Sequence, residues 1–336
     1  AAREGGVPDT AHAGFQDVRI HVRGDYSRLG DRVARGVPAI LAGADPFVIQ
    51  QGSGRVELAH WITRKSHPLT SRVLVNRLWL HHFGAALVRT PGDFGNQGTP
   101  PTHPRLLDWL ATRFVAAEWS IKSLQRQLVM SATYQQSAGS LNRLLDRKAR
   151  ELDPDNLWWG RVESRRLEVE AIRDSLLVAA GVLDRRMGGP SAPRYPGGYS
   201  RTERKTAVFS SRRRALYLMT IRGESNDGPF VLDAADPNRI VHQRSISTTA
   251  PQALLLLNDP FIRELAEALS RRIRGSAERD PNARIHKLYK LLYGRAPRQR
   301  ELTAARLFLD ARVADPGRWD DYCHALMCTN ELIYRN

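Results

Sequence analysis

Residues 69–84 read LTSRVLVNRLWLHHFG, and this stretch predicts a helix that ends at a glycine. Apolar residues recur at helical spacing from Leu69 to Phe83, and Gly84 stands at the C′ position, where the backbone often turns left-handed. A second helix is predicted to start at His103-Pro104, because proline is tolerated in the first helical turn. Ser120 is the predicted N-cap of a third helix.

Helical periodicity continues through most of the chain. It predicts further helices over 55–62, 164–183, 250–273, 281–293, 298–313 and 317–333. Short strands are predicted at Phe15–Val22, which alternates weakly, and at Ala215–Ile221, which is apolar and contains a tyrosine. We therefore predict a mainly α, multi-helix globular fold with a small minor β element.

Composition along the chain suggests four regions. Residues 1–54 are expected to be an irregular, strand-containing lead-in, and 55–183 a helical core. Residues 184–214 are rich in Gly, Pro and Ser and are interpreted as a basic connector. Residues 215–336 are expected to form a short strand and C-terminal helices that pack on the core.

Overall composition excludes some classes of protein. With 42% hydrophobic and 26% charged residues in 336, the chain has the composition of a globular protein and not of a disordered one. Its apolar runs are far shorter than about 18 residues, so no transmembrane helix is predicted. Basic residues exceed acidic ones by 51 − 35 = 16, which raises the question of a polyanionic partner.

Histidines and aspartates gather between Asn76 and Trp109. If their side chains converge, they suit a divalent metal or general acid–base chemistry; the candidates are His81, His82, Asp93, His103 and Asp108. Their spacing matches no zinc motif, so no metal is predicted, and His81, His82 and His103 are the weak candidates as ligands. In the alternative interpretation the histidines cap helices and Asp108 is a surface charge.

A second hypothesis treats the unusual residues as a structural or binding cluster. Arginine suits buried ion pairs because its planar fork binds a carboxylate with two hydrogen bonds. Asp93, Asp108 and Glu168 are the expected partners of the arginines. The members of the cluster are Asn76, Arg77, Trp79, Phe94, Trp109, Arg165, Arg166 and Arg244.

In a third hypothesis, the basic connector binds a polyanion such as an acidic or sulfated polysaccharide. The segment has few aromatic residues and no nucleic-acid-reading motif, so nucleic acid is an improbable partner. A solvated loop is the alternative interpretation. The candidate contacts are Arg185, Arg186, Arg194, Arg201, Arg204, Lys205, Arg212, Arg213 and Arg214.

Cysteine usage adds little chemistry. Cys323 and Cys328 are five residues apart in a predicted helix and point in directions about 140° apart, which disfavours a disulfide. Neither belongs to a CxxC or CxxCH motif, so zinc-ribbon, thioredoxin-like and covalent haem chemistry are not predicted. We interpret both as core residues.

Several ordered motifs resemble a planctomycete-type domain of unknown function. They span about residues 21–334 and include His67-Pro68-Leu69-Thr70-Ser71-Arg72-Val73, Ser131-Ala132-Thr133-Tyr134, Arg165-Arg166-Leu167-Glu168, Thr248-Thr249-Ala250-Pro251-Gln252, Gly294-Arg295-Ala296-Pro297 and Asn330-Glu331-Leu332. That domain closes large secreted proteins whose upstream domains include cytochrome-c-like ones. The resemblance implies a secreted or periplasmic location, upstream domains of the same polypeptide as partners, and haem only in those domains.

The resemblance implies no reaction. The leading expectation is therefore an extracytoplasmic structural or binding module of a larger protein. A metal-dependent or acid–base hydrolase acting on polysaccharide, and a polyanion binder, remain as the alternatives.

Overall fold

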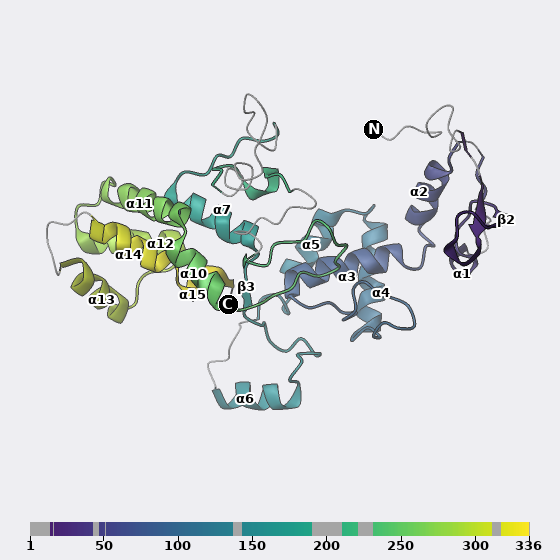
Figure 1. The fold of residues 1–336 in the computed structure, drawn as a ribbon. Coiled ribbons are helices and arrows are strands. Elements are labelled where there is room, and N and C mark those ends of the chain that lie inside the picture. The colour runs from purple at the N-terminus through teal and green to yellow at the C-terminus, as the bar shows by residue number, and fades with distance from the viewer. Residues whose placement is uncertain are drawn as a thin grey trace, which may run out of the picture. The chain divides into compact units, whose positions relative to one another are not determined.

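The computed structural model describes residues 14–15, 17–42, 47–50, 52–136, 143–189, 210–220, 231–310 and 317–335. Helices dominate these residues, and the strands form two small antiparallel pairs, so the predicted mainly α class is confirmed (Figure 1). Within them, no helix combines the length and the apolar character needed to cross a bilayer. The chain divides into two compact units, with the boundary between Arg161 and Val162.

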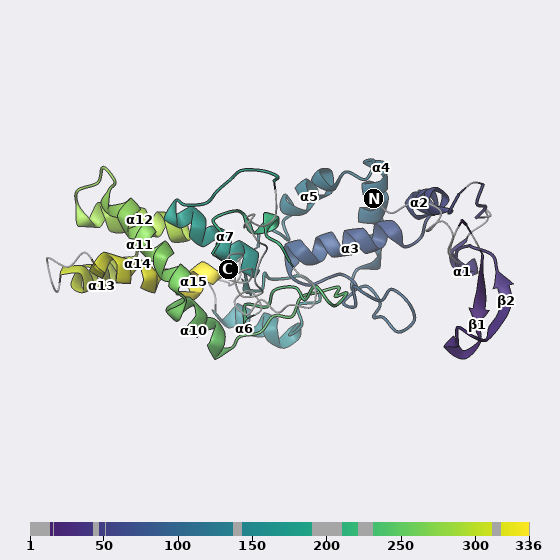
Figure 2. The same ribbon diagram turned by 45° about the horizontal axis from the view of Figure 1, so that its top comes forward.

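The first unit begins with a hairpin and continues with helices. Its elements are β1 (Val18–His21), the 3-10 turn η1 (Val22–Gly24), β2 (Leu29–Val33), α1 (Ala39–Ala42), α2 (Arg55–Thr63), α3 (Thr70–Phe83), α4 (Pro104–Ala116), α5 (Ile121–Val129) and α6 (Arg143–Leu152). The helices α3, α4 and α5 pack against one another (Figure 2). Their shared core contains Val75, Trp79, Leu87, Val88, Leu107, Leu110, Ala111, Phe114, Leu124, Leu128 and Trp159.

Local signals set these helix ends as predicted. Gly84 terminates α3 with φ 85°, a conformation that costs glycine little. Pro104 opens α4, and the Ser120 side chain accepts a hydrogen bond from the Ser123 N–H at the start of α5. The strand predicted near Phe15 is present as β1, whereas α6 was not predicted.

The second unit is a helical bundle with one short strand pair. Its elements are β3 (Arg165–Arg166), α7 (Val169–Ala180), the 3-10 turn η2 (Ala215–Tyr217), α10 (Ala250–Asn258), α11 (Pro260–Arg274), α12 (Pro281–Tyr293), α13 (Gln299–Asp310), α14 (Gly317–Met327), α15 (Asn330–Ile333) and β4 (Tyr334–Arg335). The helix α11 lies against α7, α12 and α14 (Figures 1 and 2). Leu177, Leu269, Ile273, Ile285, Leu288 and Met327 form the centre of the core.

Three predicted elements of this unit are wrong. The strand over 215–221 is instead η2, because an Asp174 carboxylate holds the Ala215 N–H and no neighbouring strand pairs with the described part of the segment. The helix over 250–273 is two helices, since Asp259 caps α11 by accepting from the Phe261 N–H at 2.8 Å. The helix over 317–333 likewise breaks between Met327 and Asn330.

Candidate functional site

Asn76 lies in α3 of the first unit and is fully buried. Its side-chain Nδ2 donates to the Val88 carbonyl at 3.1 Å, and its Oδ1 accepts from the Val88 N–H at 2.8 Å. This pair of bonds replaces the partner that a neighbouring strand would give to Val88. Asn76 therefore attaches the loop after α3 to the body of the helix.

The loop from 88 to 102 is held closed by its own polar groups. Thr90 Oγ1 donates to the Asp93 carbonyl and accepts from the Thr99 N–H, and the Thr102 N–H bonds to Leu87. At Gly98 an added Cβ would stand 2.2 Å from the Asp93 carbonyl oxygen, so only glycine fits there. The loop is a compact turn whose shape depends on close backbone approach.

Four of the five candidate catalytic residues contact groups other than one another. Asp93 Oδ1 accepts from the Gly95 N–H at 2.7 Å, and the His103 Nδ1 lies 3.1 Å from Thr102 Oγ1. His82 Nδ1 lies 2.7 Å from the Leu78 carbonyl, one turn earlier in α3, and His81 is exposed. Asp108 pairs with Arg72 at 2.6 Å.

Among the described residues, no group of three or more His, Cys, Asp or Glu side chains is arranged to hold a metal ion. The five candidates are thus not brought together as a site with converging ligands.

The aromatic members of the cluster divide between core and surface. Trp79 is buried and stacks on Phe83 with 4.0 Å between ring centroids, while Trp159 meets it edge-on. Phe94 packs partly buried against the same core. Trp109, in contrast, is 52% exposed on α4.

The guanidinium of Arg113 lies over the ring of Trp109, 5.6 Å from its centroid. Arg77 is also exposed, so it does not form the buried ion pair expected of it.

In the second unit, Arg166 forms the centre of a buried polar network. Its Nη2 bonds to Asp233 at 2.5 Å, and Asp233 also accepts from the Ser247 N–H at 2.7 Å and from the Ser247 hydroxyl. Gln252, buried in α10, donates to Ser247 Oγ at 2.9 Å. Burial alone would raise the pKa of Asp233, but the bonds from Ser247 and Arg166 outweigh it and lower that pKa.

Two nitrogens of the same arginine, Nε and Nη1 of Arg166, are buried and have no hydrogen-bond partner among the residues that the structure describes. Removal of Asp233 would therefore leave a buried charge largely uncompensated.

Arg244 forms a two-pronged ion pair with α7. Its Nη1 and Nη2 reach the two carboxylate oxygens of Glu170 at 2.6 and 3.0 Å, and Glu168 lies 3.7 Å away. The predicted Glu168 partner is thus present, with Glu170 closer. Arg165 is half-buried in β3 opposite Arg335 of β4.

Arg173 is not among the predicted site residues, yet it is one of the most buried charged side chains of the second unit. Its guanidinium donates to the backbone carbonyls of Ser211 and Arg213 and bonds to Asp174 at 3.2 Å. Asp174 in turn accepts from the Ala215 N–H at 2.9 Å. Burial lowers the pKa of Arg173, and Asp174 partly offsets this effect. The pair fixes the extended segment 211–215 on α7, a role that no short sequence motif reveals.

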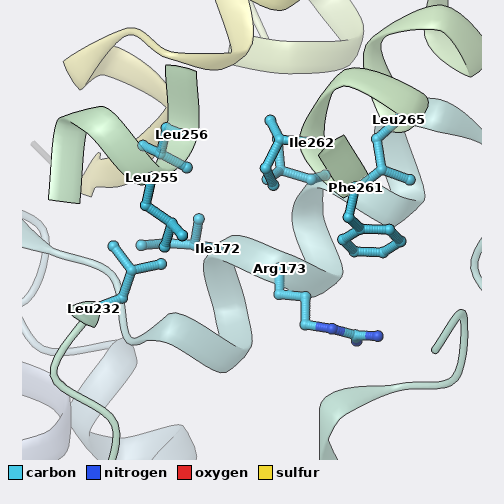
Figure 3. Close-up of a pocket in the computed structure, with 9 residues that line it drawn as sticks. Ile172, Arg173, Leu232, Leu255, Leu256, Phe261, Ile262 and Leu265 are labelled. Carbon is cyan, nitrogen blue, oxygen red and sulfur yellow. The ribbon is translucent and has the colours of Figure 1, made fainter. Parts of the chain in front are cut away.

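The pocket beside Arg173 is apolar and small. It holds about 10 Å³, roughly the space of one water molecule, and is lined by Ile172, Arg173, Leu176, Leu232, Leu255, Leu256, Phe261, Ile262 and Leu265. In Figure 3 the aliphatic residues surround the space while the guanidinium of Arg173 extends away from them, next to the Phe261 ring. The pocket is a packing defect of the core and is too small for a substrate.

The basic candidates of segment 184–214 fall into three groups. Arg186 pairs with Asp184 and lowers the pKa of that carboxyl to about 2, Arg212 pairs with Glu264, and Arg213 donates to the Gly188 carbonyl. Arg185 and Arg214 are exposed. Arg194, Arg201, Arg204 and Lys205 lie outside the described residues.

Both cysteines are free thiols. Cys323 is buried in the second core, and burial raises its pKa to about 12. Cys328 is half-buried with its pKa raised to about 11 by burial. Thiolate chemistry at neutral pH is disfavoured at both positions.

These features describe a mainly α protein of two compact units, whose buried polar side chains bind its own backbone and carboxylates. A family model described as "Protein of unknown function (DUF1553)" matches residues 54–309, and the chain belongs to this family. The predicted resemblance to a domain of unknown function is thereby confirmed. No curated protein and no solved structure is significantly similar to the chain.

Proposed function

We propose that this chain is a non-catalytic structural and binding module of a larger extracytoplasmic protein. One observation carries the proposal: the most deeply buried polar and charged side chains form hydrogen bonds and ion pairs with other parts of the same chain. Asn76 holds Val88, Arg166 holds Asp233, and Arg173 holds the backbone at 211–213. A network of this kind stabilises a scaffold and leaves its functional groups unavailable to a substrate.

The wider setting comes from the sequence resemblance. That resemblance supports a module at the C-terminal end of planctomycete-type secreted proteins, next to upstream domains that include cytochrome-c-like ones. In this setting the module packs against or presents those domains, and haem belongs to them and not to this chain. Fractionation of the source cells with an antibody against the chain tests the location: signal in the periplasm or medium supports it, and signal confined to the cytoplasm overturns it.

The hydrolase alternative is tested directly. The purified chain is incubated with neutral and acidic polysaccharides, with and without added divalent metals, and reducing ends are measured. The control is the double variant Asp93→Asn/His103→Ala, which removes two of the candidate catalytic groups. We expect equal background release from both proteins. Release by the wild type that disappears in the variant would overturn the non-catalytic assignment.

A further inference from the structure

The outer face of α4 carries an arginine–tryptophan–arginine row. Arg105, Trp109 and Arg113 follow one another at intervals of four residues, so they share one side of the helix. All three are exposed, and 52% of Trp109 is accessible to solvent. Tryptophan is strongly buried on average, so an exposed indole between two cations is an unusual use of the residue.

The row is held on a rigid support. The opposite side of α4 buries Leu107, Leu110 and Phe114 in the core shared with α3 and α5. The Arg113 guanidinium lies 5.6 Å from the Trp109 ring centroid, within the range of a cation–π contact that orients the indole. The surface therefore requires little ordering when a ligand binds.

Local charge on this face is positive. Asp108, the acidic residue next to Trp109, is paired with Arg72 at 2.6 Å, and Arg72 also donates to the Pro68 carbonyl. Asp108 is thus already neutralised by a residue outside the row. Arg105 and Arg113 then present two positive charges separated by two turns, about 12 Å along the helix axis.

We infer that this face binds a chain of acidic polysaccharide, with the C–H face of a sugar ring on the Trp109 indole and carboxylate or sulfate groups on Arg105 and Arg113. The inference rests on the binding role proposed above. Guanidinium forks match carboxylate and sulfate oxygens in pairs, and the indole supplies the apolar platform that a pure charge contact lacks.

The number of exposed aromatic rings on this face distinguishes a sugar chain from nucleic acid as the ligand. Proteins that bind single strands stack successive bases on several aromatic rings. Among residues 104–116 of α4, Trp109 is the exposed aromatic residue and Phe114 is buried. One stacking position flanked by cations favours a repeating acidic sugar.

The test measures binding of polygalacturonate and chondroitin sulfate to the purified chain by affinity electrophoresis and calorimetry, with dextran as the neutral probe and oligo(dT) as the nucleic acid. The variants are Trp109→Ala and Arg105→Gln/Arg113→Gln. Matched controls are Trp158→Ala, which removes another exposed tryptophan, and Arg263→Gln/Arg279→Gln, which removes two exposed arginines of the second unit. Circular dichroism verifies that each variant is folded.

We expect each α4 variant to weaken binding of the acidic polysaccharides at least tenfold and each control to change it less than twofold. The arginine variant should also flatten the dependence of log affinity on log salt, because fewer counterions are exchanged. Unchanged binding in Trp109→Ala, equal binding of dextran, or tighter binding of oligo(dT) would overturn the inference. Cleavage of a bound polysaccharide would instead overturn the non-catalytic role and leave the binding surface in place.

Discussion

Replacement of Asn76 by alanine gives the sharpest test of how the first unit is held together. The side chain makes both of its hydrogen bonds to the Val88 backbone, and Val88 is itself buried. Alanine would leave a buried N–H and a buried carbonyl without partners, at about 1–3 kcal/mol each. The free energy of unfolding is therefore expected to fall by about 2–6 kcal/mol, a large part of the stability of a typical domain.

The assay is urea unfolding followed by tryptophan fluorescence. The signal comes mainly from the first unit, which contains Trp61, Trp79, Trp109, Trp119, Trp158 and Trp159, whereas Trp319 lies in the second. The matched control is Asn96→Ala, the same change at an exposed position of the loop. Surface substitutions of this kind usually alter stability by less than about 0.5 kcal/mol.

A second substitution separates the hydrogen bonds from the loss of volume. Asn76→Asp keeps an acceptor for the Val88 N–H, but the ionised carboxylate has no hydrogen for the Val88 carbonyl. The difference in the free energy of unfolding between Asn76→Asp and the wild type should shrink as the pH falls, because the protonated carboxyl can donate a hydrogen bond to the Val88 carbonyl. The assigned role of Asn76 in holding Val88 would be refuted if Asn76→Ala lowered the free energy of unfolding by less than about 1 kcal/mol, or by no more than Asn96→Ala does.

Three further predictions follow from other parts of the chain. Gly98→Ala should lower the stability of the first unit by about 1–3 kcal/mol and speed proteolysis near the loop, because the new Cβ would collide with the Asp93 carbonyl. The control is Gly160→Ala, where the space around the added Cβ is open. Equal melting temperatures of the two variants would contradict the prediction. In the second unit, hydrogen bonds from Arg295 hold the pKa of Glu301 at about 2, below its ordinary 4.5, so the stabilisation from this pair is present above about pH 5 and is lost as the pH falls toward 2. In urea titrations at several pH values, Glu301→Gln should reduce this acid-induced loss of stability, whereas the control Glu267→Gln should not. Identical pH profiles for the wild type and Glu301→Gln would exclude the effect. Cys323 and Cys328 should react with a disulfide reagent at pH 8 only after unfolding in guanidinium, because burial keeps both thiols protonated, and rapid labelling of the native protein would be inconsistent with the core assignment.

The elements predicted correctly are those with a local cause. Gly84, Pro104 and Ser120 each act on the backbone within one helical turn, so their effect is visible in sequence. The break at Asp259-Pro260 has an equally local signal, an N-cap followed by proline, but the apolar periodicity on both sides concealed it. The segment at 215 has β-forming residues, but within the described part of the chain no strand pairs with it, and propensity alone carries no information about partners.

The candidate site was harder to predict because its partners are distant in sequence. Asn76 bonds to Val88, twelve residues away in the sequence, and Arg166 bonds to Asp233, sixty-seven residues away. The density of histidine and aspartate between 76 and 109 suggested convergence, yet Asp93 and His103 are satisfied by neighbours one or two residues away. Proximity in sequence favours local caps and turns, whereas a catalytic group needs side chains that leave their own backbone.

The excess of positive charge has a partly internal explanation. Many arginines donate to backbone carbonyls of loops and helix ends. The pairs include Arg89 with Asp155 and Asn156, Arg161 with Asp153 and Pro154, Arg272 with Val178 and Ala179, and Arg284 with Glu278 and Arg274. A carbonyl satisfies the guanidinium hydrogens without adding a negative charge. Each such contact fixes irregular backbone and, unlike an ion pair, adds no acidic residue to balance the charge of the arginine.

This use of arginine also restricts where a polyanion can bind. Guanidinium groups that already hold two carbonyls would have to release backbone before they contact a ligand, so their charge adds to the long-range field more than to a binding surface. Lysine cannot replace them, because a single ammonium does not span two carbonyls with the same planar geometry. The net charge of +16 is therefore a poor measure of binding capacity, and exposed, supported cations such as those beside Trp109 are the ones that a partner can reach.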